Sequence, residues 1–379
     1  MEQLKSHGKW SGKWTFILAA TGSAVGLGNI WGFPYMAGTN GGGAFVLIYL
    51  ACILIIGLPI MMAEIVIGRR ASSSPVNSMK SAALDSNRSS NWQLIGWGGL
   101  VAGILILSFY SVLAGICINY IFISALPDFQ LSSEEQFSIT TSSASNLMIW
   151  HTVFILVTAG VIASGIKNGI GRFVRVLMPL LGFILILMVL NAVINGDFLR
   201  GLQFLFSPDF SQVSPQTFLS AMGQAFFSLS LGMGALLVYG SYMPENISVA
   251  KTTFIIASLD TLVALLAGLA IFPIVLSSGL EMSQGPGLIF QTLTVAFASM
   301  PGGQLFGTMF FVLLLFAAWT SAISLIEPFI TYLMSKYNIS RIRASFISIS
   351  TSWVLGFGTI VSFNIGSNIR IFGLTIFES

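Results

Sequence analysis

The sequence predicts an all-α polytopic membrane protein that forms a single membrane domain over residues 1–379. Hydrophobic residues make up 55% of the 379 residues and charged residues only 8%, and the mean hydropathy is +0.89. No soluble globular domain of this length has such a composition. In addition, nine apolar segments are each long enough to cross a hydrocarbon core of about 30 Å, and the basic residues favour one orientation.

The nine expected spans follow one another along the chain with short connections. They cover residues 14–39, 43–67, 93–125, 147–165, 172–195, 217–241, 252–277, 303–334 and 343–364. The first span follows a polar segment with three lysines and is too long for the core of a signal peptide, so we expect it to be retained. Residues 365–379 are expected to form a tail or the start of a tenth span, beginning near Ile371.

The positions of the basic residues predict the orientation of the chain. If the N-terminus is cytoplasmic, every Lys and Arg except Arg200 and Arg370 lies on the cytoplasmic side, as the positive-inside rule requires. We therefore expect a multi-pass protein of the plasma (inner) membrane. The net charge of +3 gives no indication of a nucleic-acid partner, and the sequence gives no prediction of the oligomeric state.

The first span is interrupted by glycines. Gly22, Gly26, Gly28 and Gly32 surround the polar Asn29, and each glycine costs a helix roughly 1 kcal/mol relative to alanine. Broken backbone at membrane depth is tolerated only where protein or a polar cavity covers it. The break therefore predicts a binding site inside the bilayer, although a glycine-lined packing face explains one such segment equally well.

A second interrupted segment, residues 223–234, lies in span six and contains Ser228 and Ser230. Matching breaks five spans apart predict two five-helix repeats, inverted in the membrane because five is odd. The first repeat would cover residues 14–195, and the second, incomplete one residues 217–364. In this architecture discontinuous helices meet at the midplane and bind ions and substrate there. The matched pair thus favours a site over two packing faces.

Three acidic residues lie in apolar spans, where a functional role is the default expectation. Asp260 has no basic neighbour in its span and needs a distant partner or a cation. Glu64 lies close to Arg69 and Arg70, so functional and structural roles are equally supported, whereas Glu327 is expected to make structural hydrogen bonds.

Span eight carries two adjacent hydroxyls, Thr320 and Ser321. By analogy with other hard cations, sodium prefers such oxygen ligands. An intramembrane enzyme is disfavoured, because no metal-ligand cluster is recognisable, the histidines are His7 and His151, and no lysine lies within a span to activate a serine.

Specific motifs carry a resemblance to a known family over nearly the whole chain. They are Trp10-Ser-Gly-Lys-Trp, Gly22-Ser-Ala-Val-Gly-Leu-Gly-Asn-Ile-Trp, Phe33-Pro-Tyr, Asn40-Gly-Gly-Gly-Ala-Phe, Phe226-Phe-Ser-Leu-Ser-Leu-Gly and Asp260-Thr-Leu-Val. The chain resembles the neurotransmitter:sodium symporter family, and most closely its bacterial amino-acid transporters. The resemblance implies the leucine-transporter fold with broken helices 1 and 6. It also implies sodium-coupled uptake of a neutral, hydrophobic or aromatic, amino acid by alternating access.

The resemblance also implies the ligands of one substrate site and two sodium sites. The substrate would be bound by Ala24, Leu27, Gly28, Ile106, Tyr110, Phe227, Ser228, Ser230, Met233, Ser321 and Leu325. The first sodium would be bound by the Ala24 carbonyl, Asn29, Ser228 and Asp260, and the second by the carbonyls of Gly22, Val25 and Ala317 with Thr320 and Ser321. Chloride is not expected, because Asp260 supplies the negative charge that chloride provides in relatives with an amide there.

The chain departs from the family pattern at both gates. Gly32 replaces the arginine of the outer gate, and the chain ends before the aspartate with which that arginine would pair. His7 and Ser335 replace the two partners of the inner gate. An alternative expectation is therefore a shortened, transport-inactive relative that at most binds sodium and an amino acid.

Overall fold

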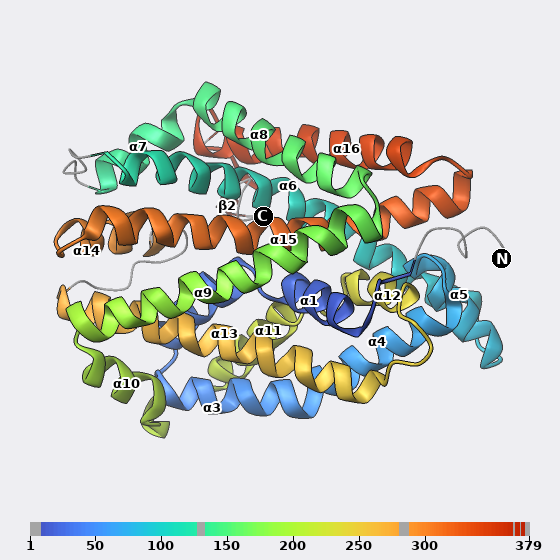
Figure 1. Cartoon of the computed structure of the whole chain (residues 1–379), viewed down its shortest axis with the longest axis horizontal. Coiled ribbons are helices and arrows are strands. Elements are labelled where there is room, and N and C mark those ends of the chain that lie inside the picture. The colour runs from blue at the N-terminus through green and yellow to red at the C-terminus, as the bar shows by residue number, and fades with distance from the viewer. Residues whose placement is uncertain (1–8, 127–132, 280–287, 367, 372, 376–379) are drawn as a thin grey trace.

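The apolar segments fold into helices that run along one long direction of the molecule (Figure 1). The computed structural model describes residues 9–126, 133–279, 288–366, 368–371 and 373–375. Up to residue 124 the helices are α1 (Lys13–Ala24), the π-helical turn Gly28–Gly32, α2 (Phe33–Thr39), α3 (Gly43–Cys52), the π-helical turn Ile53–Gly57, α4 (Leu58–Ala71), α5 (Pro75–Asp85), the 3-10 turn Ser90–Trp92 and α6 (Gln93–Ser124).

The remaining elements follow in the same way. They are α7 (Ser133–Ser142), α8 (Ala144–Ala163), the π-helical turn Ile166–Ile170, α9 (Gly171–Asn195), α10 (Phe198–Phe206), the 3-10 turn Phe210–Gln212, α11 (Pro215–Ser228), α12 (Ala235–Ser241), α13 (Val249–Ser277), the π-helical turn Leu288–Thr292, α14 (Leu293–Ala298), α15 (Gly303–Tyr337), α16 (Arg341–Phe363), β1 (Arg370–Ile371) and β2 (Leu374–Thr375).

The described residues contain 7 helices long and apolar enough to cross a membrane, or 8 if the bent pair Lys13–Ala24 and Gly28–Thr39 is one span. The two helices of that pair meet at 52°. The remaining expected span, 217–241, is divided into α11 and α12 and so is not counted among them. Each of the nine expected segments is therefore helical, and spans one and six are the broken ones.

Residues 365–379 were expected to form either a tail or the start of a tenth span, and their described part does not begin a helix. Where a tenth helix would begin near Ile371, β1 and β2 instead pair antiparallel as a short hairpin. Gly373, in the turn between them, has a φ of 87°, which a residue with a Cβ rarely adopts. The described part of residues 365–379 therefore contains a short hairpin, and its assignment as a tail stays a prediction.

Burial separates a central pair of helices from the periphery. In α15 and α6 the most apolar stretch is 78% and 72% buried, against 33% for α8 and 39% for both α9 and α16. Small residues allow α6 to approach its neighbours closely. A Cβ on Gly99 would lie 2.8 Å from the Gly232 carbonyl, and one on Gly103 would lie 2.6 Å from the Leu325 carbonyl. Close approach through glycine is typical of helices packed in membranes, and it sets α6 against both α15 and the break in span six.

Candidate functional site

At the first break, backbone groups inside the molecule lose their hydrogen-bond partners within the helix. Helix α1 ends at Ala24, and Val25 takes an extended conformation before helical structure resumes at Gly28. The Ser23 carbonyl accepts a hydrogen bond from Ser230 Oγ at 2.8 Å, and the Val25 carbonyl accepts one from Ser321 Oγ at 3.3 Å. The freed carbonyls are therefore covered by hydroxyls of span six and α15, as broken backbone in a membrane requires.

The second break lies opposite the first. Residues 229–234 separate α11 from α12, and Ser230, Gly232 and Gly234 all have positive φ angles. Glu64 Oε1 accepts a hydrogen bond from the Gly232 N–H at 2.7 Å. The sequence left two roles for Glu64 equally supported, and the structure shows that its carboxylate caps the unwound segment. The arginines near it in sequence bind elsewhere, Arg69 to the Ile247 carbonyl and Arg70 to Asp85.

Asp260 lies fully buried on α13 at the centre of a polar cluster. Asn29 Nδ2 donates to Asp260 Oδ1 at 2.7 Å, and Ser228 Oγ donates to Asp260 Oδ2 at 2.6 Å. Ser228 Oγ in turn accepts from Asn29 Nδ2 at 3.0 Å and from the Tyr49 hydroxyl at 3.2 Å. Spans one, two, six and seven thus meet at one carboxylate, and none of its partners among the described residues carries a positive charge.

A second group of oxygens lies between α1 and α15. Thr320 Oγ1 donates to the Ala317 carbonyl at 3.0 Å, and Ser321 Oγ reaches the Val25 carbonyl. Gly22 is in contact with Thr320, because a Cβ added there would lie 3.1 Å from Thr320 Cβ. All five residues expected around the second sodium are therefore brought together, and their oxygens are the kind of ligand that hard cations prefer.

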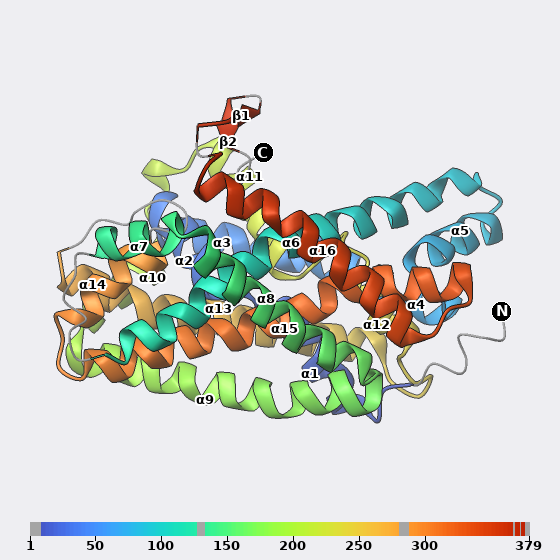
Figure 2. The ribbon, with the colours of Figure 1, turned by 90° about the horizontal axis from the view of Figure 1, so that it is seen from above.

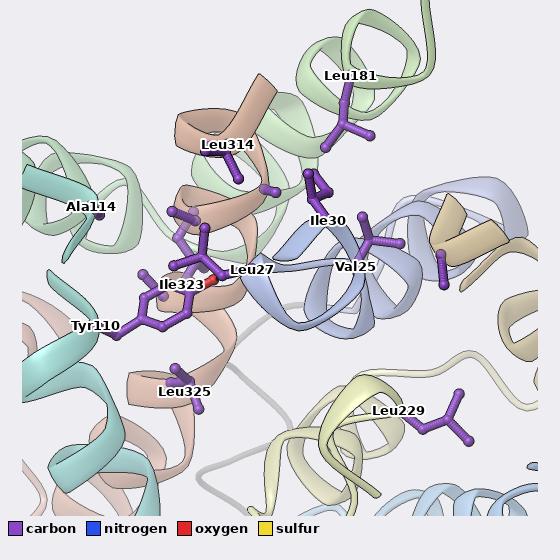
Figure 3. Close-up of a cluster of buried hydrophobic side chains, with 14 of the residues drawn as sticks. Val25, Leu27, Ile30, Tyr110, Ala114, Leu181, Leu229, Leu314, Ile323 and Leu325 are labelled. Atoms are coloured by element: carbon purple, nitrogen blue, oxygen red, sulfur yellow. The ribbon is translucent and has the colours of Figure 1, made fainter. Parts of the chain in front are cut away.

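A small cavity lies between the two breaks. It measures about 20 Å³, space for roughly one water molecule. Figure 3 shows Tyr110 reaching from α6 toward Leu27, and the Leu27 N–H donates to the Tyr110 hydroxyl at 3.2 Å. The lining residues are Ser23, Ala24, Gly26, Leu27, Gly28, Ile106, Tyr110, Phe227, Ser230, Met233, Ser321 and Leu325.

The structure thus places every substrate residue expected from the sequence around this cavity except Ser228, which belongs to the Asp260 cluster. Their role in binding stays a prediction. Ser23 and Gly26 also line the cavity and were missed, although both lie in the broken stretch that pointed to the site. Tyr49 was missed because its span is continuously apolar and only packing turns its hydroxyl toward Ser228.

A larger cavity of about 400 Å³ lies next to the first and shares Leu27, Gly28, Tyr110 and Phe227 with it. Gly32 is one of its lining residues. At this position, where the resemblance leads one to expect an arginine, Gly32 faces Gln224, whose Nε2 donates to the Gly28 carbonyl at 2.8 Å. Phe227 is 41% exposed between the two cavities. The larger cavity is consequently lined by apolar and neutral polar side chains.

A buried ion pair lies two residues beyond the cavity-lining Leu325 on α15. Glu327 accepts two hydrogen bonds from Arg341, at 2.8 and 2.7 Å, and one from the Tyr242 hydroxyl at 2.9 Å. Trp10 Nε1 donates to the Tyr239 carbonyl at 3.0 Å. Glu327 therefore makes the structural hydrogen bonds expected of it. Ser335 Oγ contacts Ser74 Oγ at 3.4 Å, and His7 lies outside the described residues.

Comparison with known proteins agrees with this architecture. The family model described as the sodium:neurotransmitter symporter family matches residues 7–132 and 129–377. An uncharacterized sodium-dependent transporter of Bacillus subtilis, YhdH, is 37% identical over 375 residues, which cover 98% of this chain and 82% of that protein. One of Haemophilus influenzae is 36% identical over 389 residues, covering 99% of this chain and 84% of that protein.

A solved structure is similar over almost the whole chain. The crystal structure of MhsT in complex with L-phenylalanine superimposes with a TM-score of 0.89 at 41% identity, covering 98% of this chain and 84% of that one. The chain accordingly has the leucine-transporter fold, while the repeat boundaries 14–195 and 217–364 stay predictions. On its sequence and its fold together, this protein belongs to the sodium:neurotransmitter symporter family.

Proposed function

We propose that this protein carries a neutral, hydrophobic or aromatic, amino acid into the cell together with sodium, by alternating access. The observation that carries the proposal is the meeting of both helix breaks around one cavity whose lining has no charged side chain, with the Asp260 cluster attached to it through Asn29 and Ser228, which follow the lining residues Gly28 and Phe227. A zwitterionic amino acid carries a carboxylate and an ammonium group into this uncharged cavity, and the backbone N–H and carbonyl groups freed at the breaks can bind both. The phenylalanine in the MhsT crystal structure supports an aromatic substrate.

The first sodium would lie at Asp260, with the Ala24 carbonyl, Asn29 and Ser228 as further ligands. A fully buried carboxylate without a basic partner among the described residues is stabilised by a cation. Because this carboxylate is a fixed negative charge, we propose that chloride is not needed. The second sodium would be bound by Thr320 and Ser321 with the carbonyls of Gly22, Val25 and Ala317.

The substrate would lie with its carboxylate at the start of the helix that follows the first break. The N–H groups of Leu27 and Gly28 and the Tyr110 hydroxyl lie there, and helix N-termini favour anionic groups. The Leu27 N–H, which donates to the Tyr110 hydroxyl in this structure, would donate to the substrate carboxylate instead. Its ammonium group would meet the carbonyls around Ala24, Phe227 and Ser228. Ile106, Met233 and Leu325 would surround its side chain. Since the cavity holds roughly one water molecule, we expect Met233 and Phe227 to move when the substrate binds.

Access is the remaining part of the proposal. We propose that the N-terminus is cytoplasmic and that the protein resides in the inner membrane, as the loop charges predict. The 400 Å³ cavity beside Phe227 would then be the outer entrance. Trp10 and the Glu327–Arg341 pair would close the cytoplasmic end. The proposed activity is transport alone, with no enzymatic step.

Uptake into proteoliposomes tests the proposal. With an inward sodium gradient, labelled L-phenylalanine should accumulate, whereas a potassium gradient should give none and labelled L-glutamate should not enter. The variant Tyr110→Phe removes one hydroxyl that contacts the proposed carboxylate position, so uptake should fall about tenfold or more. Tyr120→Phe makes the same change further along α6, away from the cavity lining, and should leave uptake unchanged.

Three outcomes would count against the proposal in different ways. Uptake that ignores sodium would contradict the coupling. Equal uptake by Tyr110→Phe and the parent protein would contradict the proposed position of the substrate. Sodium-dependent binding of phenylalanine without accumulation would instead support a protein that binds without transporting.

A further inference from the structure

Basic side chains from two separate segments lie together at one end of the molecule. Lys167, Arg172 and Arg175 are exposed in the π-helical turn before α9 and in the first turns of α9. The start of α1 lies beside them, because a Cβ added to Gly171 would be 3.0 Å from Thr15 Cγ2. Figure 2 shows the beginning of α1 next to this end of α9. Lys13, two residues before Thr15, lies at this same end of the molecule, and we count it with the basic cluster.

The cluster continues directly into an exposed apolar stripe on α9. Val176 is 60% exposed, Phe183 58% and Ile186 53%, and together with Leu180 and Leu190 they follow Arg172 at helical spacing. The other side of α9 is buried against α1, α13 and α15. In a membrane protein such a stripe faces acyl chains, and the arginines at its end lie at the level of the headgroups.

These positive charges are not neutralised within the described residues. Asp85 pairs with Arg70 and Glu327 with Arg341, and no acidic side chain in the described part of the chain pairs with Lys13, Lys167 or either arginine of the cluster. Trp14 is 65% exposed at the start of α1, and the Lys13 ammonium lies 5.9 Å from its ring centroid. Exposed tryptophan beside lysine is typical of the membrane–water interface.

We propose that this cluster binds the phosphate of an anionic phospholipid whose acyl chains lie along the exposed stripe of α9. Basic pockets between membrane helices recognise anionic headgroups, and here charge and apolar surface are continuous on one helix face. That continuity favours a lipid over a soluble phosphate, which would leave the stripe unused. The inference goes beyond transport and does not depend on it.

Native mass spectrometry of the purified full chain in detergent tests the proposal, with phosphatidylglycerol and phosphatidylcholine as probes. The parent protein should retain phosphatidylglycerol at concentrations where phosphatidylcholine is lost. Each charge near an anionic lipid is worth about a fivefold change in affinity, so Arg172→Gln/Arg175→Gln should weaken phosphatidylglycerol binding about 25-fold. Arg172→Lys/Arg175→Lys keeps both charges and should bind within a few fold of the parent.

Lys80→Gln/Arg88→Gln is the matched control, because both side chains are exposed basic residues outside the cluster. It should bind phosphatidylglycerol like the parent. If the control loses phosphatidylglycerol binding as strongly as Arg172→Gln/Arg175→Gln, the lipid is attracted by the overall positive charge and not by a specific site. Unchanged binding by Arg172→Gln/Arg175→Gln would also overturn the proposal. Displacement of the lipid by millimolar inorganic phosphate would identify a soluble-anion site and reject the lipid. If the double glutamine variant is poorly folded, the single variant Arg172→Gln decides: about fivefold weaker phosphatidylglycerol binding supports the proposal, and unchanged binding overturns it.

Discussion

Asp260 is the residue at which the proposed mechanism is most open to test. In Asp260→Asn one carboxylate oxygen becomes an amide NH2 group, which donates hydrogen bonds and cannot accept them. The present oxygens accept from Asn29 Nδ2 at 2.7 Å and from Ser228 Oγ at 2.6 Å, so either orientation of the amide loses one of these bonds. The substitution also removes the negative charge that is proposed to bind the first sodium.

The magnitude follows from the value of a contact to a charged group, roughly 1.5–3 kcal/mol. The sodium concentration for half-saturation should therefore rise about 10- to 150-fold in Asp260→Asn. Without sodium the variant should be no less stable than the parent, because burying an amide costs less than burying a carboxylate with no cation. This combination distinguishes loss of the ion site from general unfolding.

Two measurements check the expectation. Thermal unfolding with and without sodium should show a clear sodium-dependent stabilisation in the parent and little in Asp260→Asn. Labelled phenylalanine binding in sodium gluconate should require far more sodium in the variant, and replacing gluconate by chloride should restore part of the loss. Glu245→Gln alters an exposed acidic residue outside the spans and serves as the control. Parent-like sodium dependence of Asp260→Asn in chloride-free buffer would refute the reasoning.

Two further predictions concern the substrate cavity and the buried Glu327–Arg341 ion pair. In Gly28→Ala the added Cβ would lie 2.7 Å from Phe227 Cδ1, so the Phe227 ring must shift. The affinity for phenylalanine should therefore fall about tenfold. Unchanged affinity in a binding assay would contradict the proposed position of the substrate in this cavity. Glu327→Ala leaves the Arg341 guanidinium without its carboxylate, and the free energy of unfolding should fall by roughly 3–5 kcal/mol. Asp85→Ala breaks the exposed pair with Arg70 and should lower the free energy of unfolding by less than about 1 kcal/mol. If thermal unfolding shows equal losses for Glu327→Ala and Asp85→Ala, the buried Glu327–Arg341 pair does not have the stabilising role assigned to it.

Much of the fold could be predicted because membrane insertion depends on local sequence. Spans such as 252–277 and 303–334 are continuous apolar stretches, and their helices α13 and α15 begin and end within three residues of the expected limits. The breaks were also predictable, because glycines that weaken a helix stand there together with polar residues, Asn29 in span one and Ser228 and Ser230 in span six. Glycine alone is not sufficient, since α6 contains several glycines and is continuous. The expected residues of the substrate cavity came from the resemblance to the family: Leu27 and Gly28 lie in the first break, whereas residues such as Tyr110 lie on a continuous helix.

Contacts between distant spans were not predictable in the same way. Glu64 stands beside two arginines in the sequence, yet its carboxylate binds the Gly232 N–H, 168 residues away. Tyr49 looks like any aromatic residue of an apolar span until packing brings its hydroxyl to Ser228. The tail near Ile371 is apolar enough to suggest a helix, but the turn at Gly373 pairs it as a hairpin.

The sequence by itself determined that this chain is a membrane protein, where its helices run, which two of them break, and which oxygen-bearing residues lie at the breaks. Only the tertiary structure decided which carbonyls, hydroxyls and carboxylates meet, how large the space between them is, and which charges stay exposed on the surface. The reason is physical. Hydropathy and helix propensity act over about 20 consecutive residues, whereas the partner of a buried polar group is set by which helices pack together.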